Sequence, residues 1–166
     1  KNYMILETGT LRTINEWSDG QSTRLFDMFV NFHQGNVYSV DISEDACMTA
    51  QSIVSPKVFF RCGDSVQFLH ERSSNEKFDL IFTCPPYWTL ETYSQEDGDM
   101  SNISDYKIFL SEMKNVYEKC LSLMHENSYC CFVVADFRDY TEGRKLVNRL
   151  VPFVSDMIRC GEDAGL

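Results

Sequence analysis

The sequence lacks a long apolar run and a signal-peptide pattern. Its longest apolar run, Cys130 to Ala135, is far too short to cross a bilayer, which takes about 20 residues. No short apolar segment with a basic flank opens the chain, so secretion is not indicated. We therefore expect a cytoplasmic protein with no membrane partner.

Metal-binding and disulfide patterns are missing as well. The seven cysteines are an odd number and include no C-x-x-C pair, and the three histidines are scattered without ligand spacing. Buried thiols in a reducing compartment explain such cysteines better than a disulfide framework. We predict no structural metal.

Basic residues are few, with 15 Lys and Arg against 25 Asp and Glu, for a net charge of −10. Neutralisation of phosphates dominates nucleic-acid affinity, so a nucleic-acid partner would require basic surface from further segments or from a partner subunit. The length of 166 residues and the 43% hydrophobic content suit one compact domain over 1–166. The chain starts at Lys1 and stops just after a helix-ending Gly165, and we expect it to be a fragment.

Apolar runs and helical spacings alternate along the chain. Strands are predicted over 3–8, 37–42, 58–62, 78–83 and 129–136, the last as a central strand. Helices are predicted over 22–32, 44–54, from a cap at Asp64 to about 70, 105–124, and 145–164 with an interruption near Pro152. This alternation indicates an α/β fold with a doubly wound, mostly parallel sheet.

Acidic or turn-forming residues close the first three predicted strands. In a doubly wound sheet, ligands bind at the carboxyl ends of the strands. The first strand ends in Glu7-Thr8-Gly9, the second in Asp41-Ile42, and the third leads to Asp64-Ser65. These seven residues form the predicted cofactor site.

Each group in this site suits part of a nucleoside cofactor. Asp41 can accept hydrogen bonds from two ribose hydroxyls, and Asp64 from an adenine amine. Gly9 permits close approach of the backbone. The acidic Glu7 favours a cationic ligand without phosphate, such as S-adenosylmethionine (SAM). The alternative interpretation is that Asp41 and Asp64 only end a strand and cap a helix.

The fourth predicted strand runs into Cys84-Pro85-Pro86-Tyr87. Two prolines after an apolar strand fix a stiff turn whose carbonyl oxygens are free of sheet pairing. These oxygens can hold the hydrogens of an amine, and the tyrosine ring offers a flat platform for a base taken out of its stack. The alternative is an ordinary Pro-Pro turn with a packed aromatic side chain.

The run DLIFTCPPYW (79–88) resembles motif IV of the amino-methyltransferases of DNA, in which Asp, Asn or Ser precedes Pro-Pro and an aromatic residue. With the downstream run LETYS (90–94), the chain is similar to phage- and prophage-type adenine-specific DNA methylases. The resemblance covers roughly residues 37–166 and is strongest over 79–139.

The resemblance implies a Rossmann-like SAM fold and methyl transfer to adenine N6 in DNA. By match of motif, Glu7 and Gly9 fall in the donor loop, Asp41 on the donor ribose and Asp64 near the donor adenine. Cys84, Pro85, Pro86 and Tyr87 fall at the target amine as the catalytic residues, with Tyr87 stacked on the base.

Three features depart from the family pattern. The donor loop has one of its usual glycines, Cys84 replaces Asp, Asn or Ser, and no target-recognition segment or final strand pair is visible. Methyl transfer to guanine N2 in RNA or to a protein amide is therefore retained as an alternative, since those families share the Pro-Pro-Tyr signature. An inactive scaffold subunit with a methyltransferase fold is another.

Overall fold

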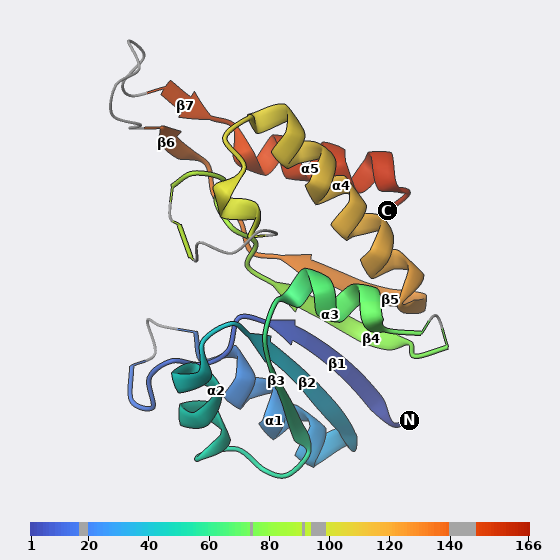
Figure 1. The fold of residues 1–166 in the computed structure, drawn as a ribbon. Coiled ribbons are helices and arrows are strands. Elements are labelled where there is room, and N and C mark those ends of the chain that lie inside the picture. Colours follow the sequence, from blue (N-terminus) through green and yellow to red (C-terminus); the bar gives the residue numbers. More distant parts are fainter. Residues whose placement is uncertain (17–19, 74, 91, 94–98, 140–148) are drawn as a thin grey trace. The chain divides into compact units, whose positions relative to one another are not determined.

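The computed structural model describes residues 1–166 except 17–19, 74, 91, 94–98 and 140–148 (Figure 1). Its elements are β1 (Tyr3–Thr8), α1 (Ser22–His33), β2 (Gly35–Asp41), α2 (Glu44–Gln51), β3 (Val58–Cys62), α3 (Ser65–Glu71), β4 (Phe78–Thr83), the 3-10 helix η1 (Met100–Asn102), α4 (Tyr106–Ser122), β5 (Met124–Phe132), β6 (Phe137–Asp139), β7 (Arg149–Val151) and α5 (Phe153–Ala164).

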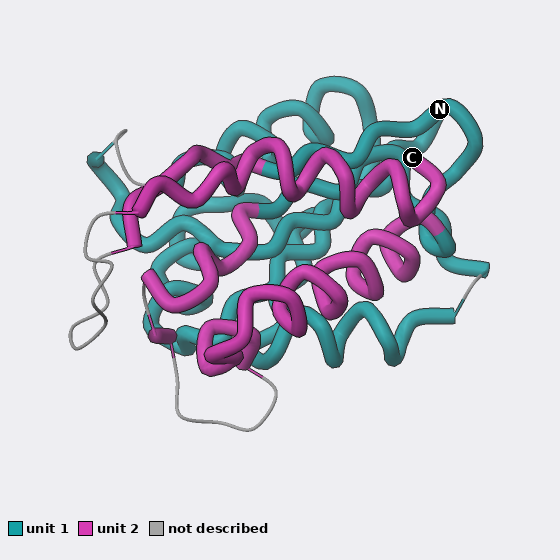
Figure 2. The backbone as a smooth tube through the Cα atoms, turned by 90° about the horizontal axis from the view of Figure 1, so that it is seen from above, with its two compact units in different colours: residues 1–83, 122–132 teal, residues 84–121, 133–166 magenta. Residues whose placement is uncertain are grey.

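Two compact units make up the chain (Figure 2). Unit 1 comprises residues 1–83 and 122–132, and unit 2 comprises residues 84–121 and 133–166. The single domain over 1–166 expected from the sequence stays a prediction.

Unit 1 contains a five-stranded sheet in the order β3-β2-β1-β4-β5. All four strand pairs are parallel. The chain builds outward from β1 to β3 and then returns to the other side of β1 to form β4, which makes the sheet doubly wound. The predicted α/β class and Rossmann-like topology are confirmed.

Alternate residues of the strands point to opposite faces of this sheet. Ile5, Val37 and Val58 are in register across β1, β2 and β3, and with Val30 of α1 they form a buried cluster. Tyr38, the next residue in β2, faces the other way and lies under the guanidinium of Arg72, just past α3. Helices α1 and α3 therefore cover opposite faces (Figure 1).

Strand β5 differs from its prediction in range and position. It spans Met124–Phe132 rather than 129–136, and it is an edge strand rather than a central one. Tyr129 is 74% exposed. The pairing with β4 shifts register between Phe78 and Leu80, which accommodates the polar residues 125–128. An edge strand does not require apolar side chains on both faces, so an apolar pattern does not mark the polar first half of β5.

Unit 2 pairs α4 with α5. The Tyr106 hydroxyl donates to Asp156 over 2.9 Å, and the Cys160 thiol donates to the Leu110 carbonyl oxygen over 3.5 Å. The predicted helix over 145–164 is wrong at its start: 145–148 lie outside the described residues, Arg149–Val151 is β7, and α5 begins only at Phe153. Pro152 separates the two because it has no N–H to continue a ladder or a helix.

Strand β7 pairs antiparallel with β6, a two-stranded sheet that the sequence did not predict. Among the described residues, no helix is both long and apolar enough to span a membrane.

Candidate functional site

The carboxyl ends of four neighbouring strands lie along one edge of the unit 1 sheet. Thr8 of β1 pairs with Val40 of β2 on one side and with Thr83 of β4 on the other, and Asp41 pairs with Cys62 of β3. The strands are parallel, so the predicted convergence of their last residues is confirmed. Asp41 ends β2, and the turn that holds Asp64 follows the adjacent strand β3.

Glu7, near the end of β1, is completely buried. Its Oε2 accepts a hydrogen bond of 2.9 Å from the Ser39 hydroxyl of β2. Its Oε1 has no hydrogen-bond partner among the described residues. Burial raises the pKa of the Glu7 carboxyl, while the hydroxyls of Ser22, Thr23 and Ser39 act to lower it. The predicted donor site therefore contains an acid whose Oε1 is without a hydrogen-bond partner among the described residues, although the Ser22 and Thr23 hydroxyls lie close enough to influence its pKa.

The Asp41 carboxylate accepts hydrogen bonds from the loop that follows β1 and from the loop that follows β2. Its Oδ2 accepts from the Thr10 N–H and its Oδ1 from the Ser43 N–H, each over 2.8 Å. Asp41 is the last residue of β2, as the sequence predicts. Each oxygen keeps a second lone pair, so the ribose role stays a prediction. Ile42 beside it is 45% exposed.

Asp64 caps α3, as the sequence indicates. Its Oδ1 accepts from the Val66 N–H over 2.7 Å and from the Gln67 N–H over 3.4 Å. Asp64 and Ser65 are both half-buried, so contact of Asp64 with an adenine amine stays a prediction.

The donor loop after β1 begins in a left-handed conformation. Gly9 has φ +89°, and a Cβ built there would meet no atom within 4 Å. Its N–H donates to the Val40 carbonyl oxygen over 2.9 Å. The Thr8 hydroxyl contacts that of Thr83 across β1 and β4. The glycine thus leaves open space beside the backbone where a ligand could approach.

Ser39 and Thr10 belong to this site, although the sequence analysis did not select them. Their hydroxyl oxygens are 2.6 Å apart, and Ser39 also donates to Glu7. Both residues are buried. A lone serine in the apolar run VYSVD is the signal that would have identified Ser39, because a buried hydroxyl requires a partner.

The Cys84 to Tyr87 turn belongs to unit 2. Cys84 is exposed, Pro85 is buried, and Pro86 and Tyr87 are half-buried. The Tyr87 ring packs against Phe153 at 5.2 Å and against Phe137 at 5.9 Å between centroids. Burial raises the pKa of Tyr87, and a backbone hydrogen bond with Ala135 opposes that rise. The ring is thus held by packing, and its stacking on a base stays a prediction.

Trp88 fixes the far end of the turn, a role that the sequence analysis missed. It is buried, has φ +52°, and donates from Nε1 to the Ile103 carbonyl oxygen over 2.7 Å. The left-handed backbone of a bulky residue is rare and is retained only where surrounding contacts enforce it. The indole therefore anchors the turn within unit 2.

No protein-family model and no curated protein matches the chain. Solved structures do. NSun6 from Pyrococcus horikoshii with SFG matches with a TM-score of 0.50 at 12% identity, over 78% of this chain and 32% of that one. A SAM dependent methyltransferase from Archaeoglobus fulgidus matches with a TM-score of 0.47 at 14% identity, over 78% and 43%.

Human methyltransferase-like protein 13 in complex with SAH matches with a TM-score of 0.48 at 12% identity, over 99% of this chain and 82% of that one. The chain spans less than half the length of the Archaeoglobus and Pyrococcus structures. At such low identity a likeness concerns the fold alone, and the chain has the Rossmann-like α/β fold that the Pyrococcus structure also has.

Proposed function

We propose that unit 1 binds SAM and that the chain transfers the methyl group of SAM to an exocyclic amine of a nucleic-acid base, adenine N6 in DNA. The observation that supports donor binding most directly is the buried Glu7, whose Oε1 has no hydrogen-bond partner in the part of the chain that the structure describes. A buried carboxylate is costly unless a cation or a donor satisfies it. The ammonium and sulfonium of SAM carry such charge, so the residues present fit this cofactor.

The other residues along the same edge fit the nucleoside part of SAM. Asp41 retains one lone pair on each oxygen for ribose hydroxyls, in addition to its bonds from Thr10 and Ser43. Half-buried Asp64 offers an acceptor for the adenine amine. Open space beside Gly9 admits the donor close to the backbone. Bound SAM would supply an electrophilic methyl group.

The Pro-Pro turn is proposed to prepare the amine for attack. Its carbonyl oxygens would accept the hydrogens of the amine, which favours the tetrahedral, nucleophilic form over the delocalised one. Cys84 offers only weakly accepting sulfur, so the Pro85 carbonyl oxygen takes the larger share. The half-buried Tyr87 ring would hold the flat base by stacking.

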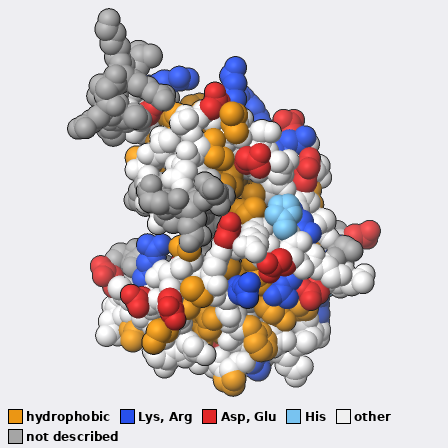
Figure 3. Space-filling view, viewed as in Figure 1, with side chains coloured by type: hydrophobic (Ala, Val, Ile, Leu, Met, Phe, Trp, Pro, Cys, Tyr) orange, Lys and Arg blue, Asp and Glu red, His pale blue; other side chains and the backbone are white. Residues whose placement is uncertain are grey.

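DNA is proposed as the substrate on the resemblance of the turn and of LETYS to the DNA enzymes. On the face drawn in Figure 3, the described Lys and Arg side chains are interspersed with Asp and Glu rather than gathered into one patch. With a net charge of −10, DNA binding then depends on basic surface from further segments or a partner subunit.

Two other functions remain candidates. Transfer to guanine N2 in RNA or to a protein amide uses the same kind of Pro-Pro-Tyr turn. An inactive scaffold is favoured by Cys84, whose thiol is a weaker acceptor than Asp, Asn or Ser. Parallel assays with radiolabelled SAM separate these candidates: label in DNA adenine supports the proposal, and label only in RNA or protein overturns the substrate. Donor binding without transfer to any of the three supports the scaffold.

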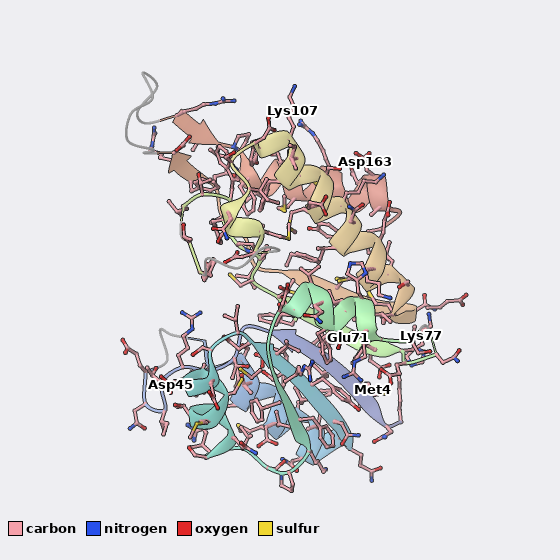
Figure 4. All side chains as sticks on the ribbon, in the orientation of Figure 1. Met4, Asp45, Glu71, Lys77, Lys107 and Asp163 are labelled. Carbon is pink, nitrogen blue, oxygen red and sulfur yellow. The ribbon has the colours of Figure 1, made fainter. Side chains whose placement is uncertain are left out.

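Asp41→Asn is expected to weaken SAM binding by about 10-fold to 100-fold, or roughly 1.4 to 2.8 kcal/mol. An asparagine keeps one acceptor oxygen, so either the Thr10 or the Ser43 N–H loses its partner and the ribose loses a charged acceptor. Calorimetric titration with SAM measures the change. The matched control is Asp45→Asn, an exposed acid in the first turn of α2 (Figure 4), whose affinity should stay within about two-fold of the wild type. Equal losses in both variants would contradict this role.

A further inference from the structure

Two thiols meet beside the predicted donor site. Cys62 ends β3 and pairs in register with Asp41, and Cys47 lies in α2, two residues after Asp45 (Figure 4). The Cys47 thiol donates to the Asp41 carbonyl oxygen over 3.8 Å, and the Cys62 thiol donates to the Ile42 carbonyl oxygen over 3.6 Å. Both thiols thus donate to the carbonyl oxygens of consecutive residues, and Cys62 lies close enough to Cys47 to raise the pKa of its thiol.

The two thiols differ in environment. Cys62 is exposed, whereas Cys47 is buried. Burial, together with the nearby Cys62 and Asp41, raises the pKa of Cys47 to about 11. The thiolate is the form that reacts with oxidants, and reaction also requires access. Cys62 is therefore the thiol that a dissolved oxidant meets first, with Cys47 beside it as a second thiol.

We propose that Cys47 and Cys62 form a reversible disulfide when the protein meets hydrogen peroxide. The Cys62 thiolate attacks one peroxide oxygen, the O–O bond breaks, and Cys62 becomes a sulfenic acid as hydroxide leaves and takes up a proton to form water. The Cys47 sulfur then attacks the sulfenyl sulfur, the S–O bond breaks, and a second water leaves with the Cys47 proton. Two thiols and one peroxide thus give one disulfide and two waters.

The disulfide would alter the donor site if unit 1 binds SAM, and this part rests on the proposed function. Its formation removes both S–H donors from the Asp41 and Ile42 carbonyls and ties α2 to the end of β3. A disulfide requires a sulfur separation of about 2.05 Å with a fixed dihedral angle, so the loop between the thiols must shift. We expect SAM affinity to fall about 10-fold, or roughly 1.4 kcal/mol.

Peptide mapping tests the disulfide independently of SAM. The native chain is treated with peroxide, alkylated and digested with trypsin, which cuts after Arg24, Lys57, Arg61 and Arg72. Cys47 is the one cysteine of peptide 25–57 and Cys62 the one cysteine of peptide 62–72. We expect these two peptides joined, lighter by two hydrogen atoms than the separate pair, and released by a thiol reductant.

Variants identify the order of events. Cys47→Ser should leave Cys62 as a sulfenic acid that dimedone traps, and Cys62→Ser should leave Cys47 unoxidised at the same peroxide dose. Cys131→Ser, which removes another exposed cysteine, should form the 47–62 link at the wild-type rate. Dimedone-labelled Cys62 in the wild type without the link would overturn the proposal, as would links that scatter among the other cysteines.

Calorimetry of the oxidised and reduced wild type with SAM then tests the coupling. The coupling is supported if oxidation lowers the SAM affinity of the wild type about 10-fold and leaves that of Cys62→Ser unchanged. Equal SAM affinities of the linked and the reduced wild type would overturn it. If the reduced protein binds no SAM while the link still forms, the proposed function fails and the disulfide stands.

Discussion

Methyl transfer by the Tyr87→Ala variant is expected to fall about 100-fold in kcat/KM, with SAM affinity within about two-fold of the wild type. Stacking of a base on an aromatic ring contributes roughly 1 to 3 kcal/mol, and the ring also packs against Phe137 and Phe153. The donor residues belong to unit 1 and Tyr87 to unit 2, so donor binding should not require the ring. Radiolabel transfer at saturating SAM and calorimetry measure the two quantities.

Tyr87→Phe is the matched control for this experiment. It retains the ring and its packing and removes only the hydroxyl, which interacts with the Ala135 backbone. We expect kcat/KM within about three-fold of the wild type, because a neutral hydrogen bond contributes about 1 kcal/mol or less when half-exposed. A phenylalanine variant as inactive as the alanine variant would contradict a stacking role, and so would a matching loss of SAM affinity in Tyr87→Ala.

Glu7→Gln is expected to weaken SAM binding by about 10-fold to 100-fold while making the unliganded protein more stable at pH 8. A charged hydrogen bond or ion pair to a buried carboxylate contributes roughly 1.5 to 3 kcal/mol, and glutamine cannot supply the charge. Without ligand, the Glu7 carboxyl is buried, its Oε1 has no hydrogen-bond partner among the described residues, and burial disfavours its ionised form. The amide avoids that cost, and the melting temperature should rise by about 2 to 4 °C for each kcal/mol gained.

The pH dependence follows from the raised pKa of Glu7. The folded protein binds the Glu7 proton more tightly than the unfolded chain, in which this carboxyl has its ordinary pKa of 4.5. The stability that this tighter proton binding contributes is fully present below pH 4.5 and is lost as the pH rises through the raised pKa of Glu7 in the folded protein. Thermal melting of the unliganded wild type should therefore show a downward step above pH 4.5 that Glu7→Gln lacks.

Glu44→Gln, at an exposed acid of α2, is the control and should follow the wild type in both melting and SAM binding. An unliganded Glu7→Gln protein less stable than the wild type at pH 8 would contradict the cost that we assign to this carboxylate.

Three strands have the bounds that the sequence predicts, 3–8, 58–62 and 78–83. Each is a short apolar run closed by turn or polar residues. Burial on both faces of a parallel strand produces such a run in β1 and β4, whereas β3 is an edge strand and is mostly exposed. Strand β5 and the segment before α5 do not have the bounds that the sequence predicts. The first half of β5 is polar, which an edge strand permits, and β7 is only three residues long. Pattern alone does not distinguish such short or edge segments from loops or helices.

The residues at the strand ends were predictable because the fold fixes which ends share one edge. Glu7, Asp41 and Asp64 all fall where the alternation of strands and helices places them. The partners of these carboxylates were not predictable. Ser39 reaches Glu7 through the register of β1 and β2, and Thr10 reaches Asp41 across 31 residues. Such pairs depend on register, which the sequence of a single chain does not reveal.

Calorimetric titration of the reduced, folded wild-type chain with SAM tests the central claim that Glu7 and its neighbours on this edge hold a cationic nucleoside. We predict one SAM bound per chain, displaced by S-adenosylhomocysteine, with affinity reduced in both Glu7→Gln and Asp41→Asn. A folded chain that gives no heat of binding, or that binds SAM equally well after both substitutions, would contradict the claim.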